Sequence, residues 1–204
     1  MSFIFVIAIV FLASYLIRNL YSFSLVKKNN ALQERFDKHE WDGLDKDLIK
    51  LAQTTAGMAN KKNQLMIKIY NNCHMMLAAI AYLSGDKDQF CHWIQHTRDT
   101  ENFPHIFAVL ALYHRAEADA EQAYKCCDKY RACREGREEN TWDELVNCFF
   151  PVDGTNDINP ERATEIAEDH GSELLCALVK ENCDILWEDD EDEETPEHPE
   201  AAEE

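Results

Sequence analysis

A run of fifteen uncharged residues near the N-terminus, Phe3 to Ile17, constrains this chain more than any other feature. It reads FIFVIAIVFLASYLI, and only Ser14 and Tyr15 carry a polar side-chain atom. Arg18 follows directly, and the pair Lys27-Lys28 comes after a mixed stretch. Such a segment is typical of a lipid environment, so we expect a membrane anchor joined to a folded domain.

Two other interpretations of this segment compete with an anchor. A cleaved signal peptide needs a positively charged start and a small-x-small cleavage site. No Lys or Arg precedes Phe3, and Ala13-Ser14-Tyr15 is the nearest approach to such a site. An apolar helix packed into a soluble core is the second alternative.

The length of the run also has to suit a bilayer. A spanning helix usually needs about 20 apolar residues. A helix extended through Leu20, Tyr21 and Phe23 supplies them if Arg18 reaches toward the headgroups. We therefore expect a single-pass anchor, with these lipid-facing residues: Phe3, Ile4, Phe5, Val6, Ile7, Ile9, Val10, Phe11, Leu12, Leu16 and Ile17.

The flanking charges predict an orientation for this anchor. Positive residues beside a span prefer the cytoplasmic side, and Arg18, Lys27 and Lys28 all follow the apolar run. We expect the N-terminus outside and the rest of the chain in the cytoplasm. The eight Cys residues agree, because they would remain reduced there.

Composition divides the chain into three parts. Residues 1–28 form the anchor and juxtamembrane segment. Residues 29–187 hold all four Trp and are long enough for one globular core. Residues 188–204 contain eleven acidic and no Lys or Arg residues, so we expect a disordered tail. With a net charge of −19, the chain is a poor candidate for binding nucleic acid.

The middle of the chain predicts an all-α fold. It contains few Gly and Pro residues and no sustained alternation of β-branched residues. Short connections imply antiparallel helix pairs. We predict helices over 31–40, 44–56, 61–83, 87–97, 104–116, 120–135, 142–149 and 160–187, the last interrupted near Gly171.

Three helix starts have a local cause in the sequence. Asp86, after Ser84-Gly85, has the position of an N-cap residue. Asn159 precedes a Pro in the first turn of the last predicted helix. Thr141 and Glu144 have the spacing of a capping box.

Two stretches of the chain repeat at a fixed interval, which separates Leu77 from Leu110 and also Asp86 from Asp119. HMMLAAIAYLSGDKDQFCHWIQHT and FAVLALYHRAEADAEQAYKCCDKY share a helix with a Leu-Ala pair, a turn ending in Asp, and a second helix. This layout resembles the tetratricopeptide repeat, a helix-turn-helix unit of about the same length as the interval. The matching positions are Leu77, Ala78, Gly85, Leu110, Ala111 and Ala123.

The resemblance implies an array of helical hairpins with a concave groove for a peptide or a partner helix. Phe90 and His114 depart from the family's pattern, which has Ala and Tyr at these positions. A helical bundle without repeats stays the alternative fold.

Motifs that would carry chemistry are sparse. His92 and His96 have the i, i+4 spacing of a metal pair, but the sequence supplies no third ligand. Cys126, Cys127 and Cys133 lack a C-x-x-C arrangement. No phosphate loop or G-x-S-x-G motif occurs. We therefore predict no catalytic, cofactor or metal site.

The sequence favours a membrane-anchored helical adaptor that binds a protein partner. A non-catalytic subunit of a larger membrane complex is the alternative, and a thiol- or metal-dependent enzyme is a third interpretation. The partner and the oligomeric state do not follow from the residues.

Overall fold

The computed structural model describes residues 3–60, 63–152 and 158–191. Within these ranges the chain forms nine α-helices and no strand, which confirms the all-α prediction. The chain divides into two compact units, Met1–Asp99 and Thr100–Glu204. The boundary lies inside the segment 29–187 that composition alone presents as one domain.

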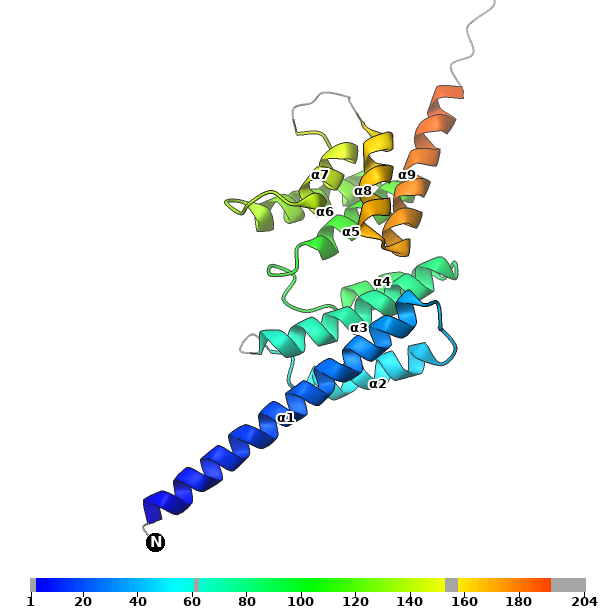
Figure 1. Cartoon of the computed structure of the whole chain (residues 1–204). Helices are drawn as coiled ribbons and strands as arrows, with labels where there is room; N and C mark the ends of the chain where they lie inside the picture. The colour runs from blue at the N-terminus through cyan, green and yellow to red at the C-terminus, as the bar shows by residue number, and fades with distance from the viewer. Residues whose placement is uncertain (1–2, 61–62, 153–157, 192–204) are drawn as a thin grey trace, which may run out of the picture. The chain divides into compact units, whose positions relative to one another are not determined.

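The first unit contains four helices: α1 (Phe3–Asp37), α2 (Leu44–Ala56), α3 (Gln64–Leu83) and α4 (Lys87–Gln95). The C-terminal half of α1 packs on α2 and α3, α2 packs on α3, and α3 packs on α4. The N-terminal half of α1 extends beyond the other three helices (Figure 1). The core of this unit includes Leu32, Leu44, Leu48, Leu51, Met66, Ile67, Phe90 and Ile94.

Helix α1 differs from the sequence prediction of a separate helix beginning at Ala31. It is one continuous helix of 35 residues. The physical reason is that residues 3–37 contain neither Gly nor Pro, so nothing in the backbone ends the helix between the apolar run and the packed half.

The second unit contains five helices: α5 (His105–Ala116), α6 (Ala120–Arg134), α7 (Thr141–Phe149), α8 (Pro160–His170) and α9 (Glu173–Glu191). Helix α5 packs on α6, α7 and α9, and α8 packs on α7 and α9. Asn182 of α9 is fully buried and donates to the carbonyl of Leu112 at 2.9 Å. Arg115 donates to the side-chain oxygen of Asn182 at 3.0 Å, so polar contacts join α5 to α9.

Most predicted helix boundaries lie close to those observed, and the caps explain them. Asp86 and Asn159 accept hydrogen bonds from the first turns of α4 and α8, as predicted. Gly171, with φ 68°, ends α8 in the left-handed conformation that Gly adopts without strain.

Two details near the helix ends differ from expectation. The capping box of α7 is formed by Asn140 and Asp143, not by Thr141 and Glu144. Asn is the better N-cap residue, so the box lies one residue earlier. Residues 188–191, predicted to belong to the acidic tail, continue α9, and the rest of that tail lies outside the described residues.

Candidate functional site

The predicted anchor occupies the N-terminal half of α1. The side chains of residues 1–6 and 8–10 lie outside the described ones, and these include Phe3, Ile4, Phe5, Val6, Ile9 and Val10. The other predicted anchor residues are exposed: Ile7, Phe11, Leu12, Leu16 and Ile17. Large apolar side chains on this part of the chain are therefore not covered by the rest of the chain.

These side chains cover most of the circumference of the helix instead of forming one narrow stripe. An α-helix turns by about 100° per residue. With Phe11 as the origin, Leu16, Leu20 and Ile17 project at about 140°, 180° and 240° around the axis. Ser14, Arg18 and Ser22 share a narrow sector on one side of this helix. The apolar side chains cover most of the remaining circumference, which is wider than the surface that a single groove covers.

Among the described residues, no helix is both long enough and apolar enough to cross a membrane. The predicted span is not supported by this finding and stays a prediction.

The buried half of α1 begins directly after the exposed half. Phe23 is 69% exposed, whereas Leu25, two residues later, is 5% exposed. Lys27 and Lys28 are exposed one turn beyond Phe23. No flexible connection separates the apolar segment from the folded unit, since both belong to one helix.

The residues of the predicted repeat lie in the α3–α4 and α5–α6 hairpins. Ala78 and Ala111 are completely buried, Ala123 is 1% exposed, Leu77 is buried and Leu110 is half-buried. Small side chains at these positions let the two helices of each hairpin approach closely.

The turns of the two hairpins have the same backbone conformation and the same hydrogen bonds. Gly85 and Ala118 both have positive φ, of 80° and 57°. Asp86 and Asp119, the next residues, accept from the backbone N–H of Gln89 and Gln122 at 3.0 and 3.2 Å. The backbone N–H groups of both Asp residues donate to a carbonyl five residues back at 2.8 Å. The repeat interval in the sequence is therefore also a structural repeat of the turn.

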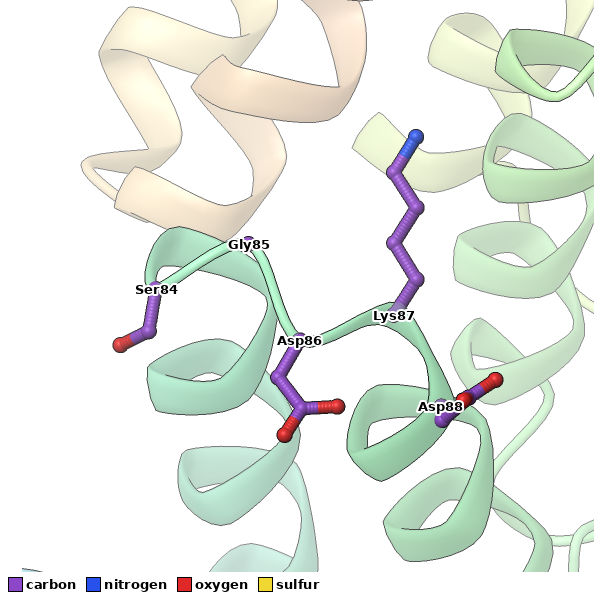
Figure 2. Close-up of a pocket in the computed structure, with 5 residues that line it drawn as sticks. All are labelled: Ser84, Gly85, Asp86, Lys87 and Asp88. Atoms are coloured by element: carbon purple, nitrogen blue, oxygen red, sulfur yellow. The ribbon is translucent and has the colours of Figure 1, made fainter.

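An open depression of about 400 Å³ lies at the first of these turns. It is lined by five consecutive residues, Ser84, Gly85, Asp86, Lys87 and Asp88 (Figure 2). The Asp86 carboxylate is already used as the cap of α4, and the Lys87 side chain extends away from the ribbon. These residues form the turn, and their arrangement indicates no particular ligand.

The structure adds a third histidine, His74 of α3, to the predicted pair His92 and His96. The ring centroids of His92 and His96 are 4.4 Å apart, and those of His74 and His96 are 6.4 Å apart. Nδ1 of His74 and of His96 donates to the carbonyl of Tyr70 and of His92, at 2.8 and 2.7 Å.

Burial lowers the pKa of His74, and the neighbouring His96, Arg98 and His92 contribute to the same shift. Within the described part of the chain, no group of three or more His, Cys, Asp or Glu side chains is arranged to hold a metal ion. The lone His74 within an apolar helix gave no sequence signal for this cluster.

Four of the eight cysteines are buried, and the other four are half-buried. All eight Cys residues are free. Burial raises the pKa of Cys73 to about 12 and that of Cys127 to about 11. These two side chains stay protonated at neutral pH and are poor nucleophiles.

A polar cluster joins α6 to α7 beside a depression of about 230 Å³. Tyr130 donates to Asp143 at 2.7 Å, and Arg134 forms an ion pair with Asp143 at 2.8 Å. Burial opposes ionisation of Asp143, but the hydrogen bonds from Arg134 and Tyr130 outweigh it and lower the pKa of this carboxyl group. Arg131 donates to the backbone of Phe150. The sequence did not predict this cluster. Its polar groups form hydrogen bonds and ion pairs with one another.

Comparison of the chain with protein families, with curated proteins and with solved structures finds no match. The resemblance to the tetratricopeptide repeat therefore rests on the residues and turns described above.

Proposed function

We propose that this protein is a membrane-anchored helical adaptor, held to the bilayer by the N-terminal half of α1. The observation that carries the proposal is the division of one continuous helix into two halves. Residues 11–23 expose large apolar side chains over most of the circumference of the helix, and from Leu25 onward the helix is packed into the first unit.

Covering the exposed half of α1 has a large energetic benefit. Removing a large apolar side chain from water contributes about 1.5–3 kcal/mol, and nine such side chains are exposed between Ile7 and Phe23. The total is on the order of 10 kcal/mol. A bilayer surrounds a helix on every side, so it suits this distribution better than a groove on a partner protein.

The predicted orientation places the N-terminus outside and both helical units in the cytoplasm. Arg18, Lys27 and Lys28 support it, because they follow the apolar residues and favour the cytoplasmic face. Free cysteines in both units are compatible with a reducing compartment.

The α3–α4 and α5–α6 hairpins are the proposed binding elements for a protein partner. Their matching turns and their fixed interval in the sequence support the resemblance to tetratricopeptide repeats, whose hairpins bind peptides and helices. Tethering would raise the effective concentration of the partner near other membrane proteins.

Extraction and protease protection of the full chain in cells test this proposal. The wild-type protein, tagged at its C-terminus, should stay in the membrane pellet at alkaline pH, and the tag should resist protease until the cells are permeabilised. Leu12→Asp combined with Leu16→Asp should release it into the soluble fraction, because charged residues are costly inside a bilayer. The matched control, Leu12→Ala with Leu16→Ala, should stay in the pellet.

Release of the wild-type protein by alkaline extraction would contradict the anchor. A tag exposed in intact cells would instead reverse the orientation. The alternative function, a permanent subunit of a larger membrane complex, predicts that the extracted protein migrates only within one large assembly of fixed composition.

A further inference from the structure

The acidic residues of the first unit are concentrated at one of its two ends, whereas lysines occur at both. Helix α2 runs antiparallel to α1 and α3, because short connections join these packed helices. An ion pair of 2.8 Å between Arg35 and Asp47 holds the end of α1 to the start of α2. Arg98 donates to the carbonyls of Ala56 and Ala59, and so lies at the opposite end of α2.

We call the two ends anchor-proximal and distal. The anchor-proximal end holds residues 22–28 of α1, the end of α2 and the start of α3. The distal end holds the α1–α2 connection and the α3–α4 turn. Figure 1 shows the exposed half of α1 leaving the unit at the anchor-proximal end.

Acidic residues gather at the distal end. Eight of the nine Asp and Glu residues in 1–99 lie in 34–47 or 86–88. Residues 1–33 and 48–85 contain none. The ninth, Asp99, accepts from Gln64 at 2.9 Å.

Lysines occupy the anchor-proximal end on two neighbouring helices. Lys27 and Lys28 are exposed on α1, and Lys68 is exposed on α3. Asn72, one turn after Lys68 on the same face, donates to Asn29 of α1 at 3.2 Å. Because α1 and α3 both run antiparallel to α2, Lys68 lies at about the same level along the unit as Lys27 and Lys28. Lys27 projects about 160° around α1 from Asn29, so the three lysines surround this level instead of sharing one face.

An exposed leucine completes this surface on the side toward the anchor. Leu65 is 44% exposed and lies three residues before Lys68 on the same face of α3. It stands seven residues before Asn72, so it lies about 10 Å closer to the apolar half of α1. The order along the unit is apolar anchor, Leu65, and then lysines.

We propose that Lys27, Lys28, Leu65 and Lys68 form a surface that rests on the headgroups of an anionic bilayer. Leu65 lies at the boundary with the acyl chains, and the three ammonium groups contact lipid phosphates or carboxylates. This inference rests on the proposed anchor and adds a preferred lipid class. Its basis is charge complementarity and continuity with the apolar half of α1. The acidic distal end points away from the same bilayer.

Hydrogen exchange of the full chain in proteoliposomes tests the inference. One preparation contains only phosphatidylcholine, and in the other phosphatidylserine replaces about a third of the lipid. Anionic lipid should slow exchange in residues 63–69 about fivefold or more, since one lysine near an anionic surface changes an equilibrium by roughly that factor.

Matched variants separate lysine contacts from a general effect of lipid charge. Lys27→Gln, Lys28→Gln and Lys68→Gln together should abolish the dependence on phosphatidylserine. Lys46→Gln with Lys87→Gln, which changes exposed lysines of the distal end, should retain it. Circular dichroism verifies that each variant is folded.

Alkaline extraction of the same liposomes distinguishes the two proposals. A protein that stays in the liposomes but exchanges equally in both lipids overturns the anionic surface and leaves the anchor intact. A protein that is extracted overturns the anchor and, with it, the surface. If the Lys46→Gln, Lys87→Gln control loses the dependence on phosphatidylserine to the same extent as the triple variant, Lys27, Lys28 and Lys68 are not the residues that contact the lipid.

Discussion

The α3–α4 and α5–α6 hairpins make the same turn but fill the space between their helices differently. Phe90 and Ala123 occupy corresponding positions of the repeat, and both are buried, with exposed fractions of 0% and 1%. Gly85 in the first turn corresponds to Ala118 in the second. Backbone hydrogen bonds and capping therefore define the hairpin, whereas the surrounding unit determines the size of the side chains between its helices.

The hairpins also differ in the polar contacts that their helices make. Asn71 of α3 accepts from the backbone N–H of Arg98 at 2.8 Å and donates to its carbonyl at 2.7 Å. In the second unit, Tyr130 and Arg134 of α6 contact Asp143 of α7. In the first hairpin a side-chain amide of α3 pairs with the backbone just after α4, whereas in the second a charged cluster joins α6 to α7 outside the hairpin.

Substitutions of the corresponding buried residues Phe90 and Ala123 should have the largest effect on the free energy of unfolding. Phe90→Ala should lower the free energy of unfolding by about 3–5 kcal/mol, because it leaves a cavity. Ala123→Phe should cost about 1–3 kcal/mol or more, because the close-packed space has no room for a ring. Urea denaturation measures both. A neutral Ala123→Phe would mean that the second hairpin contains the same space as the first.

Removing the charged cluster should have the next largest effect. Asp143→Ala deletes the acceptor of Tyr130 and Arg134 and one member of the capping box, at a cost of about 2–4 kcal/mol. Thermal unfolding of the variant gives the value. Glu144→Ala is the matched control, because its ion pair with Arg162 is exposed and should contribute less than about 1 kcal/mol.

Acid should destabilise each unit through one histidine. Burial lowers the pKa of His74 in the first unit and of His105 in the second, from an ordinary value of 6.5. Below pH 6.5 these two histidines bind protons more readily in the unfolded chain than in the folded chain. This contribution to stability is present above pH 6.5 and is lost as the pH falls toward the lowered pKa.

The two histidines can be tested separately. His74→Gln and His105→Gln should each weaken the fall in stability between pH 7.5 and pH 5.5, measured by chemical denaturation. The effect should be smaller than that of the cavity variant. His39→Asn, a change at an exposed histidine, serves as the control. An unchanged pH dependence in both Gln variants contradicts the assignment.

Substitutions of the turn residues Gly85 and Ala118 should have the smallest effects on stability, and the two effects should have opposite signs. Gly85→Ala places a Cβ at φ 80°, and although no atom lies within 4 Å of it, the backbone strain should cost about 1 kcal/mol. Ala118→Gly removes the same strain at φ 57° and should be neutral or stabilise by a few tenths of a kcal/mol. Equal signs in thermal unfolding would show that the turns are not equivalent.

Local signals in the sequence predicted most of the helices. The bounds of α2, Leu44 and Ala56, follow directly from the Gly residues on either side. The continuity of α1 was missed because composition divided the chain into an anchor at 1–28 and a separate helical domain from residue 29. The capping box of α7 was placed one residue late, since both Asn140 and Thr141 are acceptable caps.

Features that depend on topology did not follow from the sequence. The division near Asp99 has no run of Gly, Ser or Pro to mark it. The contact of His74 with His96 requires the packing of α3 on α4. The absence of acidic residues from 48–85 is visible in the sequence, but its meaning depends on which helix ends lie together.

The continuity of α1 has a geometric consequence for an anchored protein. A helix without a break couples the rotation of its exposed half to the packed half, so the azimuth of the first unit is fixed relative to the segment before it. Each residue inserted between Phe23 and Leu25 would turn that unit by about 100° and move it by about 1.5 Å. The number of residues in α1 therefore sets the direction in which the first hairpin faces around the helix axis.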